Sequence, residues 1–137
     1  MQPFHIAIPV HDLAAGREFY STVMGFREGR SDTEWIDFDM FGHQLVIHEL
    51  KGQKQNVNFN PVDEHAVPIP HFGVVLKWDD FHELVEKLKV HKVKFMIEPY
   101  IRFEGKTGEQ ATMFFMDPSG NALEFKAFKD ISQLFAK

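Results

Sequence analysis

The sequence predicts an α+β fold in which two β-α-β-β-β modules pair into a curved mixed sheet around a shared cavity. Three observations support this fold class. The order of strand-like and helix-like hydrophobic patterns in residues 3–50 recurs in residues 70–128. His5 and His71, 66 positions apart, occupy the same place in the first strand of each copy. A strong turn signal, DPSGN at 117–121, separates the last two strands.

One such module has one sheet and one helix, so it could not bury both faces of its sheet alone. We therefore expect the 137 residues to form a single domain with a concave cavity, the usual location of small-molecule sites. Its expected parts are module one at 3–50, a linker at 51–69, module two at 70–128 and a C-terminal tail at 129–137.

The elements of module one follow from local patterns. Large apolar side chains at positions 4, 6 and 8 alternate with His5, Ala7 and Pro9, as the two faces of a strand do. Asp12 is the expected N-cap of a helix, and Gly25 the residue that ends it. Three short strands are then expected at 26–31, 35–40 and 44–50. The stretch 51–70 is polar and rich in proline, which indicates a linker or lid.

Module two repeats this order. Residues 70–76 predict a strand, and Asp79 or Asp80 is the expected cap of a helix with an apolar stripe. Three more strands are expected at 93–102, 110–116 and 122–128. Residues 131–136 are expected to form a short closing helix.

Composition excludes several classes of function. The formal charge of −5 argues against nucleic acid, whose backbone favours clustered Lys and Arg. No window approaches the roughly 20 apolar residues of a membrane span, and the N-terminus lacks the features of a secretory signal. Cysteine is absent, which excludes disulfides and thiolate metal sites and fits a cytoplasmic location. We expect a small-molecule partner, with neither nucleic acid nor membrane.

The repeat brings four possible metal ligands to matching strands. His5 and His71 lie in the first strands of the modules, and His48 and Glu124 near the ends of the last strands. The residues that share a face by alternation are Gln44, Val46 and His48 in one strand and Ala122, Glu124 and Lys126 in the other. Glu49 would replace His48 if the register slipped by one residue.

A carboxylate between Leu123 and Phe125 needs a partner to offset its desolvation, and a divalent cation would provide one. Two imidazoles and one carboxylate form the facial arrangement of non-haem Fe(II) oxygenases, which also suits Mn, Ni, Co or Zn. The sequence therefore predicts a divalent metal ion, with Fe²⁺ favoured.

The segments HIAIPVHDLAAGREFYSTVMGF, PHFGVVL and FFMDPSGNALEFK resemble the vicinal oxygen chelate superfamily over residues 4–128. This superfamily includes glyoxalase I, extradiol dioxygenases, and fosfomycin and bleomycin resistance proteins. The resemblance implies paired modules around a metal, with His5, His71 and Glu124 at the three common ligand positions. It places His48 where the glyoxalase branch supplies a fourth ligand, usually Glu or Gln. It also implies a homodimer.

Tyr100 and Arg102 share a strand face before a loop that lies near the active-site entrance in this family. A guanidinium pairs well with a carboxylate, so both residues are candidates to contact a substrate carboxylate or enolate. The alternative is that Arg102 pairs with surface acids.

Three functions follow from these residues. The first is a metal-dependent dioxygenase acting on a small substrate bound through vicinal oxygens. The second is a glyoxalase-like lyase or isomerase, in which Glu124 would shuttle a proton while the metal stabilises an enediolate. The third is a non-enzymatic binder of the resistance type. A neutral ligand at His48 would leave one carboxylate on the metal, which favours the dioxygenase.

Overall fold

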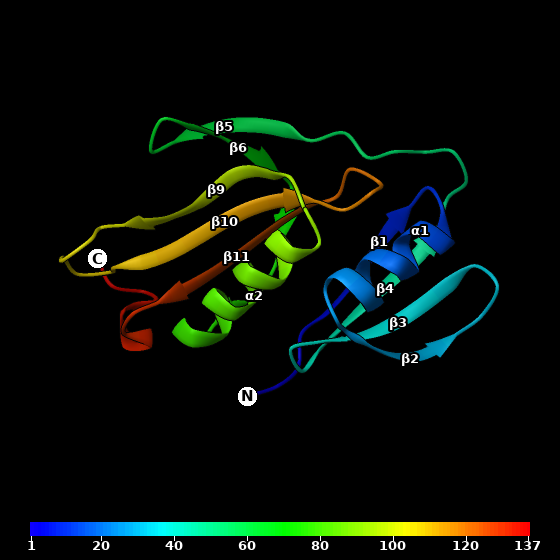
Figure 1. Ribbon diagram of the computed structural model, residues 1–137, viewed down its shortest axis with the longest axis horizontal. Coiled ribbons are helices and arrows are strands. Elements are labelled where there is room, and N and C mark those ends of the chain that lie inside the picture. Colours follow the sequence, from blue (N-terminus) through cyan, green and yellow to red (C-terminus); the bar gives the residue numbers. More distant parts are fainter. The chain divides into compact units, whose positions relative to one another are not determined.

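A computed structural model describes residues 1–137, and the chain divides into two compact units (Figure 1). The first unit comprises residues 1–57 and the turn 117–121, and the second comprises residues 58–116 and 122–137. The longest helix has 13 residues, and no helix is long and apolar enough to cross a bilayer.

The first unit contains a four-stranded sheet in the order β1-β4-β3-β2, with β1 parallel to β4 and the other neighbours antiparallel. Its elements are β1 (His5–Val10), α1 (Leu13–Arg17), η1 (Glu18–Val23), β2 (Arg27–Ser31), β3 (Trp35–Met40) and β4 (His43–Glu49). The Asp12 side chain accepts a hydrogen bond from Ala15 N at 3.1 Å, which confirms the predicted N-cap. The second half of the predicted helix, η1, is a π-helix.

The turn 117–121 is held by buried hydrogen bonds within the first unit. Asp117 is only 4% exposed and accepts from Tyr20 Oη at 2.8 Å. It also accepts from the backbone nitrogens of Ser119 and Asn121, at 2.8 and 2.9 Å, and from Asn121 Nδ2 at 2.8 Å. Burial and the neighbouring Asp117 carboxylate raise the pKa of Tyr20 well above its usual range, so its hydroxyl stays a donor.

The second unit repeats the connectivity of the first. Its main sheet has the order β7-β11-β10-β9, with β7 parallel to β11 and the other neighbours antiparallel. The elements of this unit are β5 (Asn58–Val62), β6 (His65–Ile69), β7 (His71–Phe72), β8 (Val75–Leu76), α2 (Trp78–Val90), β9 (Phe95–Arg102), β10 (Gln110–Met116), β11 (Ala122–Phe128) and η2 (Ile131–Gln133). The α+β fold class and the repeat of two β-α-β-β-β modules are confirmed.

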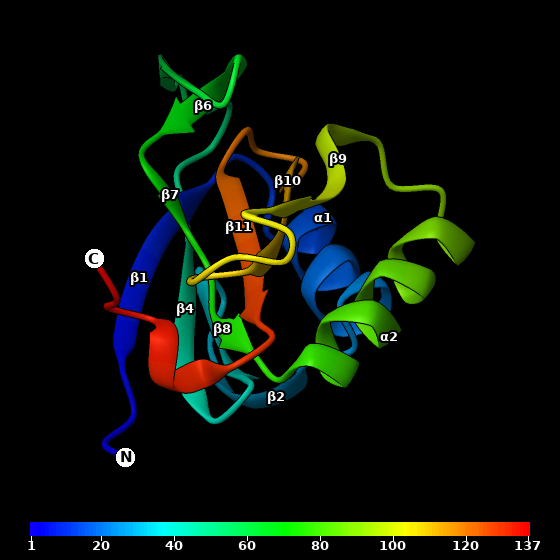
Figure 2. The same ribbon diagram turned by 90° about the vertical axis from the view of Figure 1, so that its left-hand side faces the viewer.

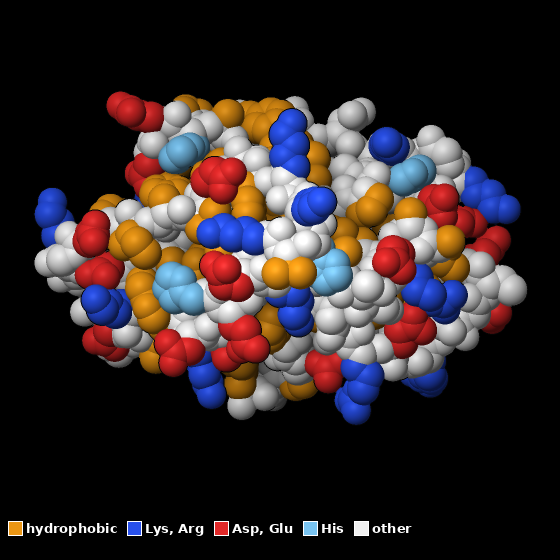
Figure 3. All heavy atoms as spheres, in the orientation of Figure 1, with side chains coloured by type: hydrophobic (Ala, Val, Ile, Leu, Met, Phe, Trp, Pro, Cys, Tyr) orange, Lys and Arg blue, Asp and Glu red, His pale blue; other side chains and the backbone are white.

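Two local predictions were wrong, and the short closing helix is confirmed only over residues 131–133. Residues 58–69 of the expected linker form the antiparallel β5–β6 hairpin, over which exposed apolar side chains gather (Figure 3). The N-cap of α2 is Lys77, and Asp79 and Asp80 lie in the first turn instead, where carboxylates interact favourably with the helix dipole. The closing helix is a single 3-10 turn, η2.

The predicted strand 70–76 is interrupted between β7 and β8, which both lie beside β11 (Figure 2). Gly73 lies in this gap. A Cβ at Gly73 would come within 1.6 Å of the Glu124 carbonyl oxygen, so only glycine permits this close approach to β11. The approach holds the backbone of Glu124 directly against the β7–β8 segment.

Candidate functional site

The second unit brings two predicted ligands together. His71 on β7 and Glu124 on β11 are joined by a contact of 2.9 Å between Nε2 and Oε2, with side chains 29% and 13% exposed. His71 Nδ1 lies 2.6 Å from the carbonyl oxygen of Pro68, which only accepts, so Nδ1 is the donor. The Phe114 ring packs edge-on against the imidazole at 5.2 Å. The ring of His71 is therefore oriented with Nε2 toward the carboxylate.

Hydrogen bonding and charge favour the ionised forms of both groups. The hydrogen bond to Glu124 raises the pKa of His71, and this effect outweighs burial, which acts in the opposite direction. Burial acts to raise the pKa of Glu124, but His71, Lys126 and Thr112 together lower it. Without metal, these effects thus favour a proton on His71 beside the ionised carboxylate. A metal ion at this pair would have to displace that proton.

The other oxygen of Glu124 has two neighbours. Thr112 Oγ1 donates to Oε1 at 2.8 Å, and Lys126 Nζ lies 3.4 Å from the same atom. These contacts fix the rotation of the carboxylate. A cavity of about 290 Å³ opens beside it, lined by His71, Phe72, Gly73, Val74, Val75, Glu124, Lys126 and Leu134.

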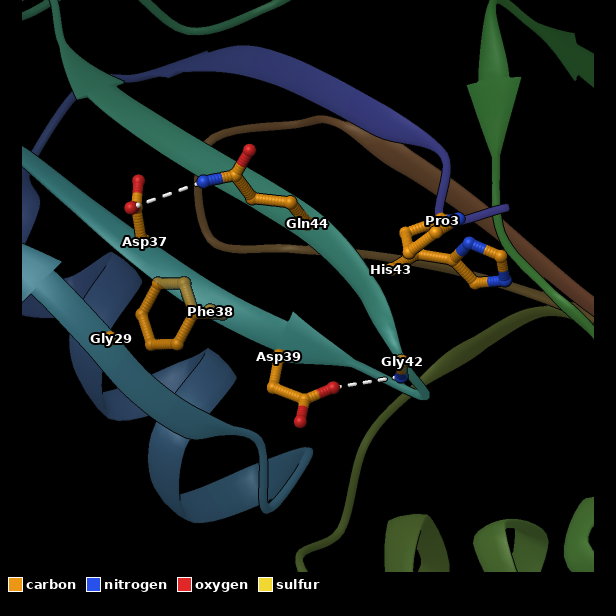
Figure 4. A pocket seen from close by; sticks show the side chains of 8 residues that line it. All are labelled: Pro3, Gly29, Asp37, Phe38, Asp39, Gly42, His43 and Gln44. Carbon is orange, nitrogen blue, oxygen red and sulfur yellow. Dashed lines mark hydrogen bonds between the residues drawn. The ribbon is translucent and has the colours of Figure 1, made fainter. Parts of the chain in front are cut away.

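His5 lies in the first unit and is oriented by a chain of hydrogen bonds. Gln44 Nε2 donates to Asp37 Oδ2 at 3.2 Å between β4 and β3, as Figure 4 shows. Because a carboxylate only accepts, this contact orients the Gln44 amide with Oε1 on its other side. That oxygen lies 2.7 Å from His5 Nδ1, which must therefore donate. Nε2 of His5 is left with its lone pair, as metal coordination requires.

The register of the first sheet separates His48 from His5. His5 is opposite Gln44 and His48 is opposite Pro9, four residues further along β1. At roughly 3.3 Å per residue, the two histidines lie about 13 Å apart along the strands. The neighbouring Glu49 accepts from Leu13 N at 2.8 Å at the start of α1.

The registers also show which residue matches Glu124. Ala122 is opposite His71, so Glu124 lies two residues beyond the partner of the histidine. In the first sheet the residue two beyond Gln44 is Val46, which is 6% exposed. The four equivalent positions of the repeat therefore hold three possible metal ligands, His5, His71 and Glu124, and one apolar residue, Val46.

Tyr100 and Arg102 share a partner on the β5–β6 hairpin. Tyr100 Oη donates to Asp63 Oδ2 at 3.1 Å, and Arg102 pairs with both carboxylate oxygens of the same residue. These contacts lower the pKa of Asp63, Arg102 making the largest contribution. Neither Tyr100 nor Arg102 lines the cavity beside Glu124.

No group of three or more His, Asp or Glu side chains in the structure is arranged so that it could hold a metal ion. The assignment of His5, His71, Glu124 and His48 as metal ligands thus stays a prediction. The sequence reasoning did not assign roles to Gln44, Thr112 and Lys126. Strand alternation already placed Lys126 on the face of Glu124, and that signal could have identified it.

The comparisons with known proteins agree with this architecture. Residues 2–125 match the family model described as the Glyoxalase/Bleomycin resistance protein/Dioxygenase superfamily. No protein with a curated description matches the chain significantly. A glyoxalase/bleomycin resistance protein/dioxygenase from Alicyclobacillus acidocaldarius is 33% identical, with a TM-score of 0.80, over 98% of this chain and 96% of that one.

Two more distant structures share the fold. A fosfomycin resistance protein from Listeria monocytogenes is 20% identical with a TM-score of 0.67, covering 93% of both chains. A lactoylglutathione lyase from Agrobacterium tumefaciens is 17% identical with a TM-score of 0.67, covering 99% of this chain and 97% of that one. On the family match and the 33% identity, the chain belongs to the Glyoxalase/Bleomycin resistance protein/Dioxygenase superfamily.

Proposed function

We propose that the protein is a divalent-metal enzyme of the dioxygenase type, in which His5, His71 and Glu124 hold the ion. The proposal rests on the hydrogen bonds of the Nδ1 atoms of His5 and His71, which are alike. In each, Nδ1 donates to a carbonyl-type oxygen, from Gln44 or Pro68, so Nε2 is the nitrogen that can bind a metal ion. Such outer contacts are typical of metal-binding histidines. In His71 this nitrogen now contacts Glu124, the third proposed ligand. The donor set of two imidazoles and a carboxylate fits Fe²⁺ and also Mn²⁺, Co²⁺, Ni²⁺ or Zn²⁺.

In this proposal the bound ion would polarise two neighbouring oxygens of a small substrate and, as iron, supply redox chemistry with O₂. Gln44 and Pro68 keep the imidazoles in the tautomer that can bind. Thr112 fixes Oε1 of Glu124. Phe72 and Leu134 line the cavity with apolar groups.

Val46 favours the dioxygenase over the lyase. With an apolar residue at the position equivalent to Glu124, the strands offer three donors and leave coordination positions open, as in Fe(II) oxygenases. The alternatives are a glyoxalase-like lyase, in which Glu124 would move the proton, and a non-enzymatic binder. Because Asp63 already neutralises Arg102 and holds Tyr100, we give the catalytic role to Glu124 and leave those two residues as second candidates.

Metal content distinguishes these functions. The protein would be purified from cells grown without added transition metals, and the bound element measured by mass spectrometry. We expect iron near one equivalent, and loss of it in His5→Ala and His71→Ala. Nickel or zinc would favour the lyase. Full metal content in both variants would contradict the ligand assignment, and no metal in the wild type would favour the binder.

The hydrogen bond from His5 to Gln44 gives a second expected result. Gln44→Leu removes the acceptor, so His5 can rotate or change tautomer, and zinc affinity should fall about 10- to 100-fold. The double variant Gln44→Glu/Asp37→Asn keeps an acceptor for His5 and lets residue 37 donate to residue 44, so it should bind nearly as well as the wild type. Affinities would be measured by competition with a chelator.

Asp39→Ala is the matched control, because Asp39 lies opposite Gln44 on the neighbouring strand β3 and bonds to Gly42 and Arg27 rather than to the Gln44 side chain. It should leave zinc affinity unchanged. If Gln44→Leu bound zinc as tightly as the wild type while His5→Ala did not, the orienting role of Gln44 would be wrong.

Assembly and location follow from the same proposal. We propose a homodimer, to be measured by light scattering in solution. A cytoplasmic location and the absence of nucleic-acid and membrane partners stay predictions.

A further inference from the structure

Lys126 is the only Lys or Arg that lines the cavity beside Glu124. Its side chain is 27% exposed, and Nζ lies 3.4 Å from Glu124 Oε1. Across the sheet it is opposite Thr112 on β10 and Val75 on β8. Apart from His71 and Glu124, the remaining side chains around the cavity are apolar. A half-buried ammonium thus stands beside the candidate metal ligand.

A bound metal ion would increase the surplus of positive charge around Glu124. The single negative charge of Glu124 now partners both His71 and Lys126. If a divalent ion binds Glu124, as the proposed function requires, His71 is neutral and the ion and Lys126 together carry three positive charges against one negative. A surplus of this size in a partly buried cavity favours an anionic ligand.

We propose that the cavity selects a small organic acid, whose carboxylate pairs with Lys126 while two neighbouring oxygens of the same molecule face the metal ligands. This inference rests on the proposed function for the metal, but the contact with Lys126 is a separate feature. The volume of about 290 Å³ lies at the lower end for ligand cavities and suits a compact molecule. The opposing interpretation is that Lys126 only neutralises Glu124.

Two hydroxamates of similar size test the selection, because each presents two neighbouring oxygens to a metal. Butanohydroxamate ends in a methyl group, and succinic monohydroxamate ends in a carboxylate. On the zinc-loaded protein we expect the acidic probe to bind roughly tenfold more tightly by calorimetry. Lys126→Met should abolish this preference and Lys126→Arg should retain most of it, with unchanged zinc content in both.

A metal-free measurement keeps the two proposals apart. Glu124→Gln removes the carboxylate that competes for Lys126, so this variant should bind butanoate in an NMR titration, whereas Glu124→Gln/Lys126→Met should not. Equal affinities of the zinc-loaded wild type for both hydroxamates, or a preference that survives Lys126→Met, would overturn the selection by Lys126. A third outcome is that zinc enhances the binding of neither hydroxamate while Glu124→Gln still binds butanoate. This outcome would overturn the metal function and leave the contact between Lys126 and an anion standing.

Discussion

Replacing Glu124 with glutamine should reduce the affinity for a divalent ion by roughly 100-fold or more, because the only anionic donor of the set is lost. Glutamine has the same shape and can still bond to Thr112 and His71, so a loss of binding would reflect the charge and not a collapsed cavity. The measurement is zinc or iron affinity by chelator competition on the purified variant. Circular dichroism would show that the fold is retained.

His48→Ala is the matched control for this experiment. His48 is exposed and lies about 13 Å along the strands from His5, so its removal should leave metal affinity within about twofold of the wild type. A wild-type affinity in Glu124→Gln would show that this carboxylate is not a ligand. A large loss in His48→Ala would restore the glyoxalase-like set of four ligands.

The repeat made most of the fold predictable, because its signals are local. Most of the sheet strands have enough alternation to be recognised, and Asp12 has the side chain that an N-cap needs. The β5–β6 hairpin was missed because each of its strands contains a proline, Pro61 or Pro68, and proline indicated a linker. Its strands are held by backbone pairing between neighbours, which composition does not reveal.

The candidate site was predictable only in part. Alternation correctly gave Glu124 and Lys126 a common face, and the repeat gave His71 its place beside β11. Alternation does not fix the register between two paired strands, however. The register of β1 and β4 is what places His48 about four residues along the strands from His5. The role of Gln44 depends on that same register and on Asp37, a neighbour from another strand.

Replacing Asp117 with alanine should cost about 4 kcal/mol of unfolding free energy, the largest stability effect we expect from a polar residue. The carboxylate is buried and accepts four hydrogen bonds from Tyr20, Ser119 and Asn121. Its removal leaves these donors without a partner, at about 1–3 kcal/mol for each buried group that stays unpaired. Urea unfolding of the metal-free protein would measure the loss.

Tyr20→Phe separates the hydroxyl from the carboxylate. It removes one donor and leaves Asp117 with three hydrogen bonds, so it should cost only about 1–2 kcal/mol. Glu86→Ala is a surface control, because its contact with Lys89 is exposed and contributes at most about 0.5 kcal/mol. If Asp117→Ala cost no more than Glu86→Ala, the turn would not depend on this carboxylate. The DPSGN motif would then matter through its backbone conformation, including Gly120 at a φ of 84°.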